Sequence, residues 1–597
     1  MKKQRFSESG VFNVRTLFAF ALCSTGTLLA MFSFAATFPV NTSATSSLAP
    51  ATGSWSIVNS PNTDPSQSNQ LNGVTCVSAS DCWAVGNYFG GTYYHTLVEH
   101  WDGNAWTITP SPNASETAFN NFYAVACTSA SDCWTVGYGT SFETLIEHWD
   151  GSSWSIVPSP NVTAVQNILT GLACTSASDC WAVGYYRAGP NAAGIYNYPS
   201  LIEHWDGNAW TVAPAPATGW NEDELYQVTC TSSSNCWAVG YTSGPDPLGP
   251  FQTLIEQWDG VSWEIVTSPN TTPANNNYLF AVSCNSATDC RAAGYSNTPE
   301  AGNATTLVTH WNGTSWTIDS TPNIDISGNN AFFGIACASS ATCWGAGYYN
   351  GSNAIQTLIE RWDGNSWTIS RSSNTSAAEA NVLNFVTCSS AYDCWTVGYS
   401  QDSSSVSHNL IEHYTVPAVQ LVEAVSRKVH GSAGVFDIVL RGQDPPPPGY
   451  LGIECRSGGV NGDYTLVFTF ANNLTSVGGA SVSSGTGSVS NAAIGSDFHQ
   501  YLVNLTGVTN AQTITVGLSN VSDSAGNFSP AVAGQMGVLL GDVNASGRVD
   551  AADVSLVRQQ TLQNVDGSNF REDINASGRI DAADVSIARR QTLTSLP

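Results

Sequence analysis

Short runs of β-branched and aromatic residues alternate along most of the chain with turns of Gly, Asn, Ser and Pro. One representative stretch contains four such runs, at residues 123–127, 133–138, 144–149 and 154–157. Apolar runs this short, bounded by turn residues, predict β-strands. The last two are joined by Asp150-Gly151-Ser152, and Gly accepts the positive φ of a tight hairpin. The pattern predicts a four-stranded unit.

This unit recurs seven times, at a period of about fifty residues that is typical of propellers and stacked repeats. Each copy opens with a pair of cysteines and usually continues with segments similar to Trp-Ala-Val-Gly-Tyr, Leu-Ile-Glu-His-Trp-Asp-Gly and Trp-Thr-Ile. The pairs are Cys76/Cys82, Cys127/Cys133, Cys174/Cys180, Cys230/Cys236, Cys284/Cys290, Cys337/Cys343 and Cys388/Cys394. The repetition predicts a seven-bladed β-propeller over residues 51–415.

The two ends of the repeat region predict how the propeller closes. The last Leu-Ile-Glu-His strand, at residues 410–413, is followed by neither an Asp-Gly hairpin nor a Trp strand. An unmatched Trp strand begins instead at Trp55, before the first cysteine pair. We expect it to pair with residues 410–414 and complete the seventh blade, which removes an open sheet edge.

Side chains that recur in each copy are expected to serve the fold. All twenty Trp lie between Trp55 and Trp395, and their repetition favours packing between blades over a sugar-binding surface. The recurring Glu and His residues are Glu99, Glu147, Glu203, Glu256, Glu360, Glu412, His100, His148, His204, His310 and His413. An enzyme uses one acid–base set, so this repetition favours scaffold roles such as cross-strand hydrogen bonds, and we assign no catalytic residue.

One acidic cluster stands outside the obvious repeat: Glu222, Asp223 and Glu224, next to the non-repeated Trp220. It is a candidate ligand loop for a metal or a sugar. The competing interpretation is a solvated loop.

The N-terminus has the pattern of a secretory signal peptide over residues 1–36, with Lys2, Lys3 and Arg5 before an apolar run. Retention as an anchor is the alternative. Residues 37–50 read as a linker, and no later stretch is expected to span a membrane.

Because an exported chain keeps cysteines oxidised, we expect seven disulfides. Zinc is the competing interpretation, but two Cys per copy leave its coordination incomplete. Cys455 stays unpaired.

The net charge of the chain limits which classes of partner it can bind. Net charge is −27, and residues 37–415 contain no Lys and four Arg. Nucleic-acid binding needs a basic stripe, so we exclude it. The composition is typical of a secreted or cell-surface bacterial protein.

Beyond residue 415 the repeat stops. Alternating runs at residues 464–470, 500–505 and 513–518 predict an antiparallel β-sandwich over residues 416–538. Its closing segment, Asn-Val-Ser-Asp-Ser-Ala-Gly-Asn at residues 520–527, resembles the final turn of bacterial Ig-like domains. That resemblance implies a spacer without chemistry.

A duplicated loop carries the strongest chemical signal, starting at Asp542 and again at Asp573. Oxygen-bearing side chains fall at positions 1, 3, 5, 9 and 12 of the calcium-loop pattern, with Gly at position 6 and a backbone carbonyl at position 7. The expected ligands at two Ca²⁺ sites are Asp542, Asn544, Ser546, Arg548, Asp550, Asp553, Asp573, Asn575, Ser577, Arg579, Asp581 and Asp584. We expect helices over residues 554–562 and 585–593.

On these loops, residues 541–594 resemble a dockerin, the module with two calcium-loop-plus-helix repeats that binds a cohesin domain. The resemblance implies calcium-dependent docking to a cohesin-like or other protein partner. Two departures stand out: Ser546 and Ser577 replace a common Asp, and Ala pairs occupy positions 10 and 11, which often contact the partner. A standard cellulosomal cohesin is therefore not the expected partner. An acidic flexible tail is the competing interpretation.

These features predict a mainly β, secreted, non-catalytic modular protein. The propeller serves as a binding or display platform, the sandwich as a spacer and the dockerin-like module as a calcium-dependent dock. The alternative is a polysaccharide-degrading hydrolase acting on O-glycosyl compounds, or an auxiliary carbohydrate-binding protein of such a system, because dockerins commonly accompany them.

Overall fold

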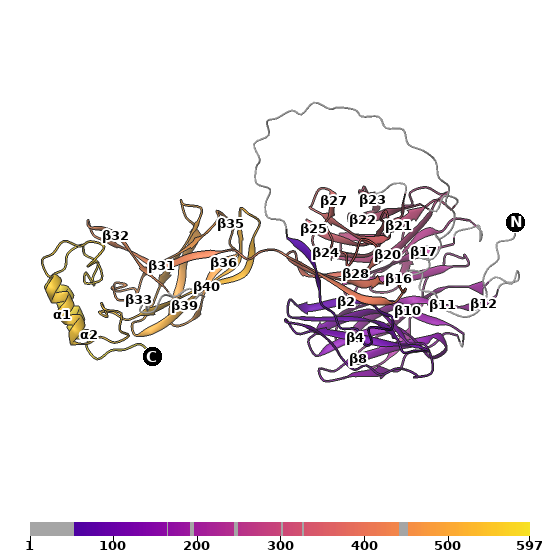
Figure 1. Cartoon of the computed structure of the whole chain (residues 1–597), viewed down its shortest axis with the longest axis horizontal. Helices are drawn as coiled ribbons and strands as arrows, with labels where there is room; N and C mark the ends of the chain where they lie inside the picture. The colour runs from indigo at the N-terminus through magenta and orange to yellow at the C-terminus, as the bar shows by residue number, and fades with distance from the viewer. Residues whose placement is uncertain are drawn as a thin grey trace, which may run out of the picture. The chain divides into compact units, whose positions relative to one another are not determined.

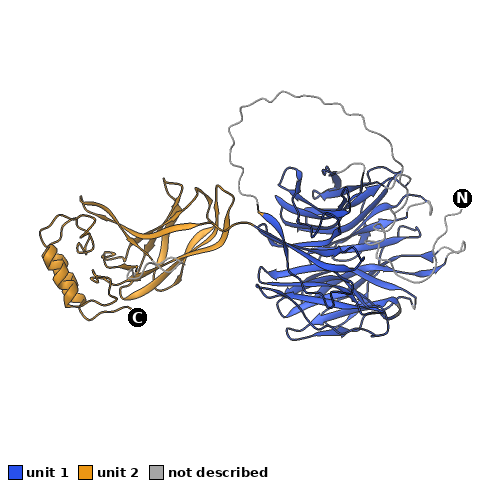
Figure 2. Cartoon of the chain, viewed as in Figure 1, with its two compact units in different colours: residues 1–37, 54–415 blue, residues 38–53, 416–597 orange. Residues whose placement is uncertain are grey.

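The computed structural model describes residues 53–597 except 164, 191–195, 244–248, 300–302, 325–327 and 441–451. The predicted signal peptide and linker lie outside the described residues. Two compact units are present: the repeat unit, residues 54–415, and the C-terminal unit, residues 416–597 (Figure 2). Within the described part of the chain, no helix is long and apolar enough to cross a membrane.

The repeat unit contains seven antiparallel four-stranded sheets typical of a propeller (Figure 1). The first three sheets are β2 (Asn69–Ser78), β3 (Asp81–Phe89), β4 (Tyr94–Trp101), β5 (Trp106–Ile108); β6 (Asn121–Ser129), β7 (Asp132–Gly139), β8 (Glu143–Trp149), β9 (Trp154–Val157); β10 (Asn167–Ser176), β11 (Asp179–Tyr186), β14 (Ser200–Trp205) and β15 (Trp210–Val212). The connections add η1 (Thr140–Phe142) and a hairpin of β12 (Ala188–Pro190) and β13 (Tyr196–Asn197).

The remaining sheets repeat this order. The fourth to sixth are β16 (Asp223–Ser232), β17 (Asn235–Thr242), β18 (Gln252–Trp258), β19 (Trp263–Ile265); β20 (Asn276–Ser286), β21 (Asp289–Asn297), β22 (Ala304–Trp311), β23 (Trp316–Asp319); β24 (Asn330–Ser339), β25 (Thr342–Asn350), β26 (Ile355–Trp362) and β27 (Trp367–Ser370). The seventh is β28 (Ala380–Ser390), β29 (Asp393–Gln401), β30 (Ser407–Thr415) and β1 (Ser54–Val58).

The seventh sheet combines strands from both ends of the repeat unit. β1 pairs antiparallel with β30, so that Trp55 lies opposite Tyr414 and Val58 opposite Ile411. The predicted pairing of the Trp55 strand with residues 410–414 is confirmed. The first strands of successive sheets contact each other, as β2 contacts β6, and β2 also contacts β28 of the seventh sheet.

Tryptophans pack between neighbouring sheets. The Trp181 ring on β11 lies 4.7 Å from that of Trp258 and 5.3 Å from that of Trp263, both in the next sheet. Trp83 makes the equivalent contact with Trp154 at 5.3 Å. Aromatic pairs at these separations add to the stability that their buried area provides. The predicted packing role of the repeated tryptophans is confirmed.

In the C-terminal unit two five-stranded sheets enclose a core that includes Phe468, Val516 and Met536, all fully buried. One sheet is β32 (Gly434–Val439), β31 (Leu421–His430), β34 (Tyr464–Phe470), β38 (Gln500–Thr506) and β37 (Ser488–Ile494). The other is β33 (Ile453–Glu454), β40 (Phe528–Val538), β39 (Gln512–Asp523), β35 (Leu474–Ser476) and β36 (Gly479–Ser484). The expectation of a wholly antiparallel arrangement is wrong for one pair. β33 runs parallel to β40, because the chain reaches β33 from the other sheet rather than through a hairpin.

Two helices follow the sheets, α1 (Ala551–Gln560) and α2 (Ala582–Gln591). Each begins three residues before its predicted start, because Asp550 and Asp581 cap the helix N-termini through their side chains. Each also ends two residues early. Leu562 and Leu593 lie just beyond, with φ values of 72° and 79° that no helix accommodates.

The helical module, predicted as a separate domain, shares one compact unit with the two sheets. Cys455, unpaired as expected, packs in a cluster with Val543 and Ile574 of the module. The Arg571 guanidinium donates a 3.1 Å hydrogen bond to the carbonyl of Ile453 on β33. The module is therefore held against the sheets by both apolar and polar contacts.

Candidate functional site

The first candidate calcium loop wraps around the buried carboxylate of Asp542. That carboxylate accepts hydrogen bonds from the backbone N–H groups of Ser546 at 2.9 Å and Gly547 at 2.8 Å. Ala545 and Gly547 have φ values of 56° and 84°, which turn the chain sharply enough to direct both N–H groups inward. Gly suits this conformation because it has no Cβ.

The second loop repeats this geometry. Asp573 accepts from the N–H groups of Ser577 at 3.0 Å and Gly578 at 2.7 Å. Ala576 and Gly578 have φ values of 54° and 85°. Two segments that match in sequence have thus folded to the same local structure.

Hydrogen bonds connect the remaining expected ligands within each loop. In the first, the Ser546 N–H also donates to the Asn544 side chain, and the Ser546 hydroxyl donates to the Arg548 carbonyl at 2.9 Å. The Asp553 carboxylate accepts from the N–H groups of Asn544 at 3.2 Å and Asp550 at 2.9 Å. The same bonds recur in the second loop. The structure therefore brings all six predicted positions of each loop together.

The electrostatics of the loops suit a cation. Burial raises the pKa of Asp542, and the neighbouring Asp553 carboxylate raises it further. Burial and the carboxylates of Asp573 and Asp581 likewise raise the pKa of Asp584. Among the described residues no three His, Cys, Asp or Glu side chains form a metal cluster by themselves. A site here also needs amide, hydroxyl and carbonyl oxygens, the hard ligands that Ca²⁺ accepts. The donor set fits that ion.

The seven cysteine pairs of the repeat unit are disulfides, as predicted. In each pair the two cysteines lie directly opposite on the first and second strands of a sheet, as Cys76 and Cys82 do. Zinc coordination by these residues is thereby excluded.

The second cysteine of each pair belongs to the core of its sheet, whereas the first cysteines Cys174 and Cys230 are among the residues that line a groove between the third and fourth sheets. The first cysteine of each pair is half-buried. The second, on the second strand of its sheet, is almost completely buried, which applies to Cys82, Cys133, Cys180, Cys236, Cys290, Cys343 and Cys394. All of these except Cys394 pack in an apolar cluster between two sheets, as Cys180 does with Leu169 and Trp134. These residues stabilise the fold and are closed to a ligand.

Five of the six repeated glutamates, all except Glu360, join neighbouring sheets. Buried Glu147 accepts a 2.9 Å hydrogen bond from Ser111, and buried Glu203 accepts one of 2.7 Å from Ser159. These serines belong to the Ser-Pro-Asn segments that leave the preceding sheet. The expectation of cross-strand bonds is wrong for the glutamates, because the recurring Ser supplies a closer donor. The repeated Ser-Pro-Asn is visible in the sequence, but its contact with the glutamate of the next sheet was not predicted.

The same burial changes the ionisation of these carboxyls. It raises the pKa of Glu99, Glu147, Glu203 and Glu256 to about 8, that of Glu360 to about 9 and that of Glu412 to about 7. Desolvation disfavours the charged form of a buried acid. The glutamates are therefore structural groups, and the fold of the repeat unit favours their neutral form.

The repeated histidines make the expected cross-strand bonds. His148 Nε2 lies 2.7 Å from the Asp132 carboxylate on the adjacent strand, and the imidazole stacks on Trp134 with ring centroids 4.2 Å apart. His204 pairs with Asp179 at 2.8 Å in the same way. Recurrence of this contact from sheet to sheet indicates a scaffold role.

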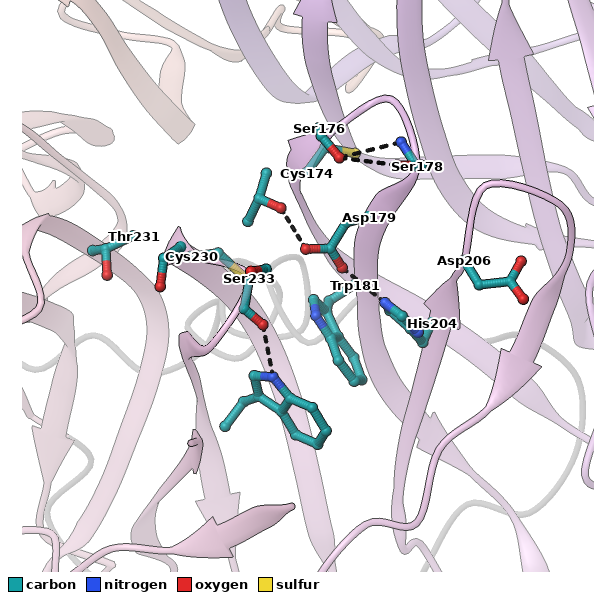
Figure 3. A pocket seen from close by; sticks show the side chains of 13 residues that line it. Cys174, Ser176, Ser178, Asp179, Trp181, His204, Asp206, Cys230, Thr231 and Ser233 are labelled. Atoms are coloured by element: carbon teal, nitrogen blue, oxygen red, sulfur yellow. Dashed lines mark hydrogen bonds and ion pairs between the residues drawn. The ribbon is translucent and has the colours of Figure 1, made fainter. Parts of the chain in front are cut away.

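A groove of about 850 Å³ lies between the third and fourth sheets. Asp179 contacts Thr175 and His204 along one side (Figure 3), and Ser233 accepts a 3.0 Å hydrogen bond from the half-buried Trp258 on the other. The lining is rich in hydroxyl groups. It combines hydrogen-bonding groups with an aromatic ring, without a cationic residue.

The four residues of the predicted acidic ligand loop are not gathered into one site. Asp223 occupies the position of an Asn in the other repeats, such as Asn167. Both side chains accept from a backbone N–H of the preceding loop, Thr218 at 3.0 Å and Val162 at 2.9 Å. Trp220 is 44% exposed. Successive residues of a strand point to opposite faces, so Asp223 and its neighbour Glu224 on β16 diverge.

Glu224 lies in a buried tyrosine cluster, close enough to Glu222 for the two carboxyls to repel each other. Its Oε2 accepts hydrogen bonds from Tyr226 at 2.9 Å and Tyr241 at 2.8 Å. Burial raises the pKa of this carboxyl to about 7. The tyrosines of neighbouring first and second strands surround it, and no periodic signal in the sequence indicates that contact.

Residues 540–592 match the dockerin type I domain family. Dockerin type I domains bind calcium and cohesin partners. The module thus has the fold signature and the loop chemistry of a calcium-dependent docking domain. No curated protein matches the chain.

The repeat unit has likenesses among solved structures. They include YCF48 bound to D1 peptide, 13% identical, covering 60% of this chain and 96% of that chain at a TM-score of 0.39. An ulvan lyase from a polysaccharide lyase family is 10% identical, with 60% and 94% covered and a TM-score of 0.37. The six-bladed fucose-recognising lectin of Aleuria aurantia is 14% identical, with 51% and 95% covered and a TM-score of 0.32. At TM-scores this low, the likenesses carry no argument about what this chain binds.

Proposed function

We propose that this chain is an exported modular protein whose C-terminal module, residues 541–594, docks to a cohesin-like or other protein partner in a calcium-dependent manner. The repeat unit is the platform that the module carries, and the Ig-like sheets of residues 416–538 are the spacer. The observation that carries the proposal is the pair of loops whose expected Ca²⁺ ligands fall into the same hydrogen-bonded arrangement twice.

Calcium has a defined task in this proposal. Each loop places two buried carboxylates, such as Asp542 and Asp553, close enough to raise a pKa by repulsion. A bound Ca²⁺ supplies the opposing charge, and the oxygens at positions 1, 3, 5, 7, 9 and 12 are its ligands. Loss of the ion leaves like charges facing each other, so the loops and the helices that they cap lose order.

The partner surface lies on the helices. The Ala pairs at positions 10 and 11 of each loop are exposed, and Leu562 and Leu593 are 89% and 82% exposed at equivalent places. Small and apolar side chains here favour a partner with a largely apolar contact surface.

The platform is a closed seven-bladed propeller in this proposal. The pairing of β1 with β30 supports closure. So do the hydrogen bonds from the Asn384 side chain to the Leu71 carbonyl at 2.8 Å and from the Asn409 N–H to Asn62 at 3.0 Å. Both join residues from opposite ends of the repeat region. The recurring Glu residues other than Glu360, and the recurring His residues, are occupied by scaffold contacts, which supports a non-catalytic platform.

The groove between the third and fourth sheets favours one further role, binding of a neutral carbohydrate. Its hydroxyl groups offer hydrogen bonds to a ligand beside the aromatic ring of Trp258. In this role the protein is an auxiliary of a polysaccharide-degrading system rather than its hydrolase. A glycan array tests it, with Trp258→Ala expected to abolish binding. Trp149→Ala, at the same position of another sheet, is the matched control.

The docking proposal is tested on the full chain by calorimetric titration with Ca²⁺ and by capture of a candidate cohesin in calcium or in chelator. We expect two binding events and capture only with calcium. Asp542→Ala combined with Asp573→Ala should remove both. No calcium heat, or equal capture in chelator, would overturn the proposal.

A further inference from the structure

The two calcium loops differ in their surroundings although their sequences are almost the same. From Asp542 to Asp553 and from Asp573 to Asp584 they differ only in the exchange of Val for Ile at two positions. Their internal hydrogen bonds match. Their contacts with residues outside the loops differ. His430 Nδ1, at the end of β31, lies 2.9 Å from Asp573 Oδ2, whereas the Arg571 guanidinium donates a 3.2 Å hydrogen bond to the backbone carbonyl of Asp542. Among the described residues, no side chain outside the first loop is hydrogen-bonded to the carboxylate of Asp542.

The direction of this hydrogen bond follows from its neighbours. Arg456 Nη1 lies 3.2 Å from His430 Nε2. A guanidinium only donates hydrogen bonds, so Nε2 must be the accepting nitrogen and the ring proton must be on Nδ1. A neutral His430 therefore donates its Nδ1–H to the carboxylate of Asp573.

Arg456 is itself fixed. It donates to both oxygens of Glu454, at 2.8 and 2.7 Å, and to the carbonyls of Phe436 at 2.9 Å and Ser426 at 2.8 Å. The side chains of His430, Arg456 and Glu454 are 0% exposed. A buried network whose polar groups are paired rigidifies its members. The two sheets thus hold the imidazole in one orientation.

Backbone contacts reinforce the contact between sheet and loop. Gly431 follows His430 with a φ of 46°, and a Cβ at that position would lie 2.2 Å from the carbonyl oxygen of Ser577. A Cβ on Gly578 would lie 2.8 Å from the carbonyl oxygen of His430. The turn after β31 therefore lies directly against positions 5 and 6 of the second loop.

We propose that His430 is a positioning residue for the second calcium site, so that this site binds Ca²⁺ more tightly than the first. The inference rests on the proposed function, that the loops bind calcium. Partners that hydrogen-bond a metal ligand fix its orientation, and their loss commonly lowers affinity about 10- to 100-fold. Because the loop sequences are nearly identical, a difference in affinity must come from outside them. His430 orients a ligand of the second site, whereas Arg571 places a positive charge beside Asp542 of the first.

The test uses the full chain with one loop silenced. In Asp542→Ala the second loop remains, and in Asp573→Ala the first. Calorimetric titration with Ca²⁺ should give about tenfold tighter binding in Asp542→Ala. This comparison needs no change at His430, so it stands even where a His430 variant fails to fold. Equal affinities, or tighter binding by the first loop, would overturn the inference.

Two amide substitutions of His430 then test the hydrogen bond from His430 to Asp573 by itself. His430→Asn keeps a donor near the Nδ1 position, whereas His430→Gln keeps an acceptor for Arg456 and loses that donor. In the Asp542→Ala background we expect His430→Gln to weaken calcium binding about tenfold and His430→Asn to restore most of it. In the Asp573→Ala background neither should change the affinity. Thermal unfolding in chelator reports whether each variant still folds.

The outcomes separate this inference from the proposed function. If calcium binds but its affinity does not depend on His430, the inference is overturned and the proposed function stands. Absence of calcium heat in both single-loop backgrounds overturns the proposed function and the inference with it. Equal weakening of both loops by His430→Gln indicates a general loss of stability and also overturns the inference.

Discussion

The repeat unit and the C-terminal module stabilise small repeated elements in opposite ways. Each copy in the repeat unit carries its own covalent link and a buried carboxyl or its substitute, all supplied by the chain. The module has two copies, and each concentrates carboxylates that repel one another until a cation binds. Small units with little core of their own commonly need disulfides or metals. The repeat unit is stabilised by its own disulfides, whereas the C-terminal module depends on a cation from solution. Experiments that reduce disulfides or remove cations should therefore affect the two regions differently.

Reduction is the largest expected difference. Each disulfide closes a short loop and contributes about 2 kcal/mol by the loop-entropy estimate, and the repeat unit has seven. Dithiothreitol should therefore unfold the repeat unit or lower its Tm by more than about 10 °C. The C-terminal unit has no disulfide among its described residues and should be unchanged. Calorimetry resolves the two transitions, and equal shifts in both would contradict the comparison.

Removal of calcium should have the converse effect. At 100 times its Kd a ligand stabilises the native state by about 2.7 kcal/mol per site. We therefore expect the transition of the C-terminal unit to fall by several degrees in chelator and that of the repeat unit to stay. Limited proteolysis should cut within residues 541–594 only in chelator. A chelator effect confined to the repeat unit would show that calcium acts elsewhere.

Opposite responses to pH sharpen the comparison further. Burial raises the pKa of the repeated glutamates to about 7 to 9, so the folded repeat unit holds protons that the unfolded chain releases. The contribution of these protonated glutamates to the stability of the repeat unit is fully present below about pH 4.5. It is lost as the pH rises through their folded-state pKa values. We expect its Tm to fall from pH 5 to pH 9.

Glu454 of the C-terminal unit has the reverse dependence. Burial opposes ionisation, but Arg456 outweighs it and lowers the pKa to about 2. Its contribution is present above about pH 4.5 and is lost as pH falls toward 2. Acid should thus weaken the C-terminal unit while mild alkali weakens the repeat unit. The Tm of each transition between pH 2 and pH 9 checks both signs, and parallel curves would contradict them.

The smallest expected effect compares two repeated glutamates. Glu360 is buried, and neither oxygen has a hydrogen-bond partner among the described residues, whereas Glu412 accepts from Ser372 at 2.8 Å. Thr309 occupies the same position in another repeat. Glu360→Thr should be neutral or stabilise by about 1 kcal/mol, and Glu412→Thr should destabilise by a similar amount. Denaturant unfolding at pH 8 measures both, and a larger loss at Glu360 would refute the contrast.

Periodic signals in the sequence were sufficient for much of the structure. The Cys pairs predict the disulfides, and the unmatched Trp55 strand predicts its pairing with β30. The loop spacing from Asp542 and from Asp573 predicts the two local folds. These features succeed because each depends on a few residues close in sequence, or on a repeat that appears seven times.

Contacts between segments distant in the sequence needed the tertiary structure. In the sequence, Asp223 is part of an acidic cluster. The fold shows that it occupies the position of the Asn that recurs in the other repeats. All the repeated glutamates except Glu360 accept hydrogen bonds from serines of the preceding sheet, because the fold brings those positions of neighbouring sheets together. His430 lies far along the chain from Asp573, and only the packing of the sheets against the module brings the imidazole to one calcium loop and not to its near-identical copy.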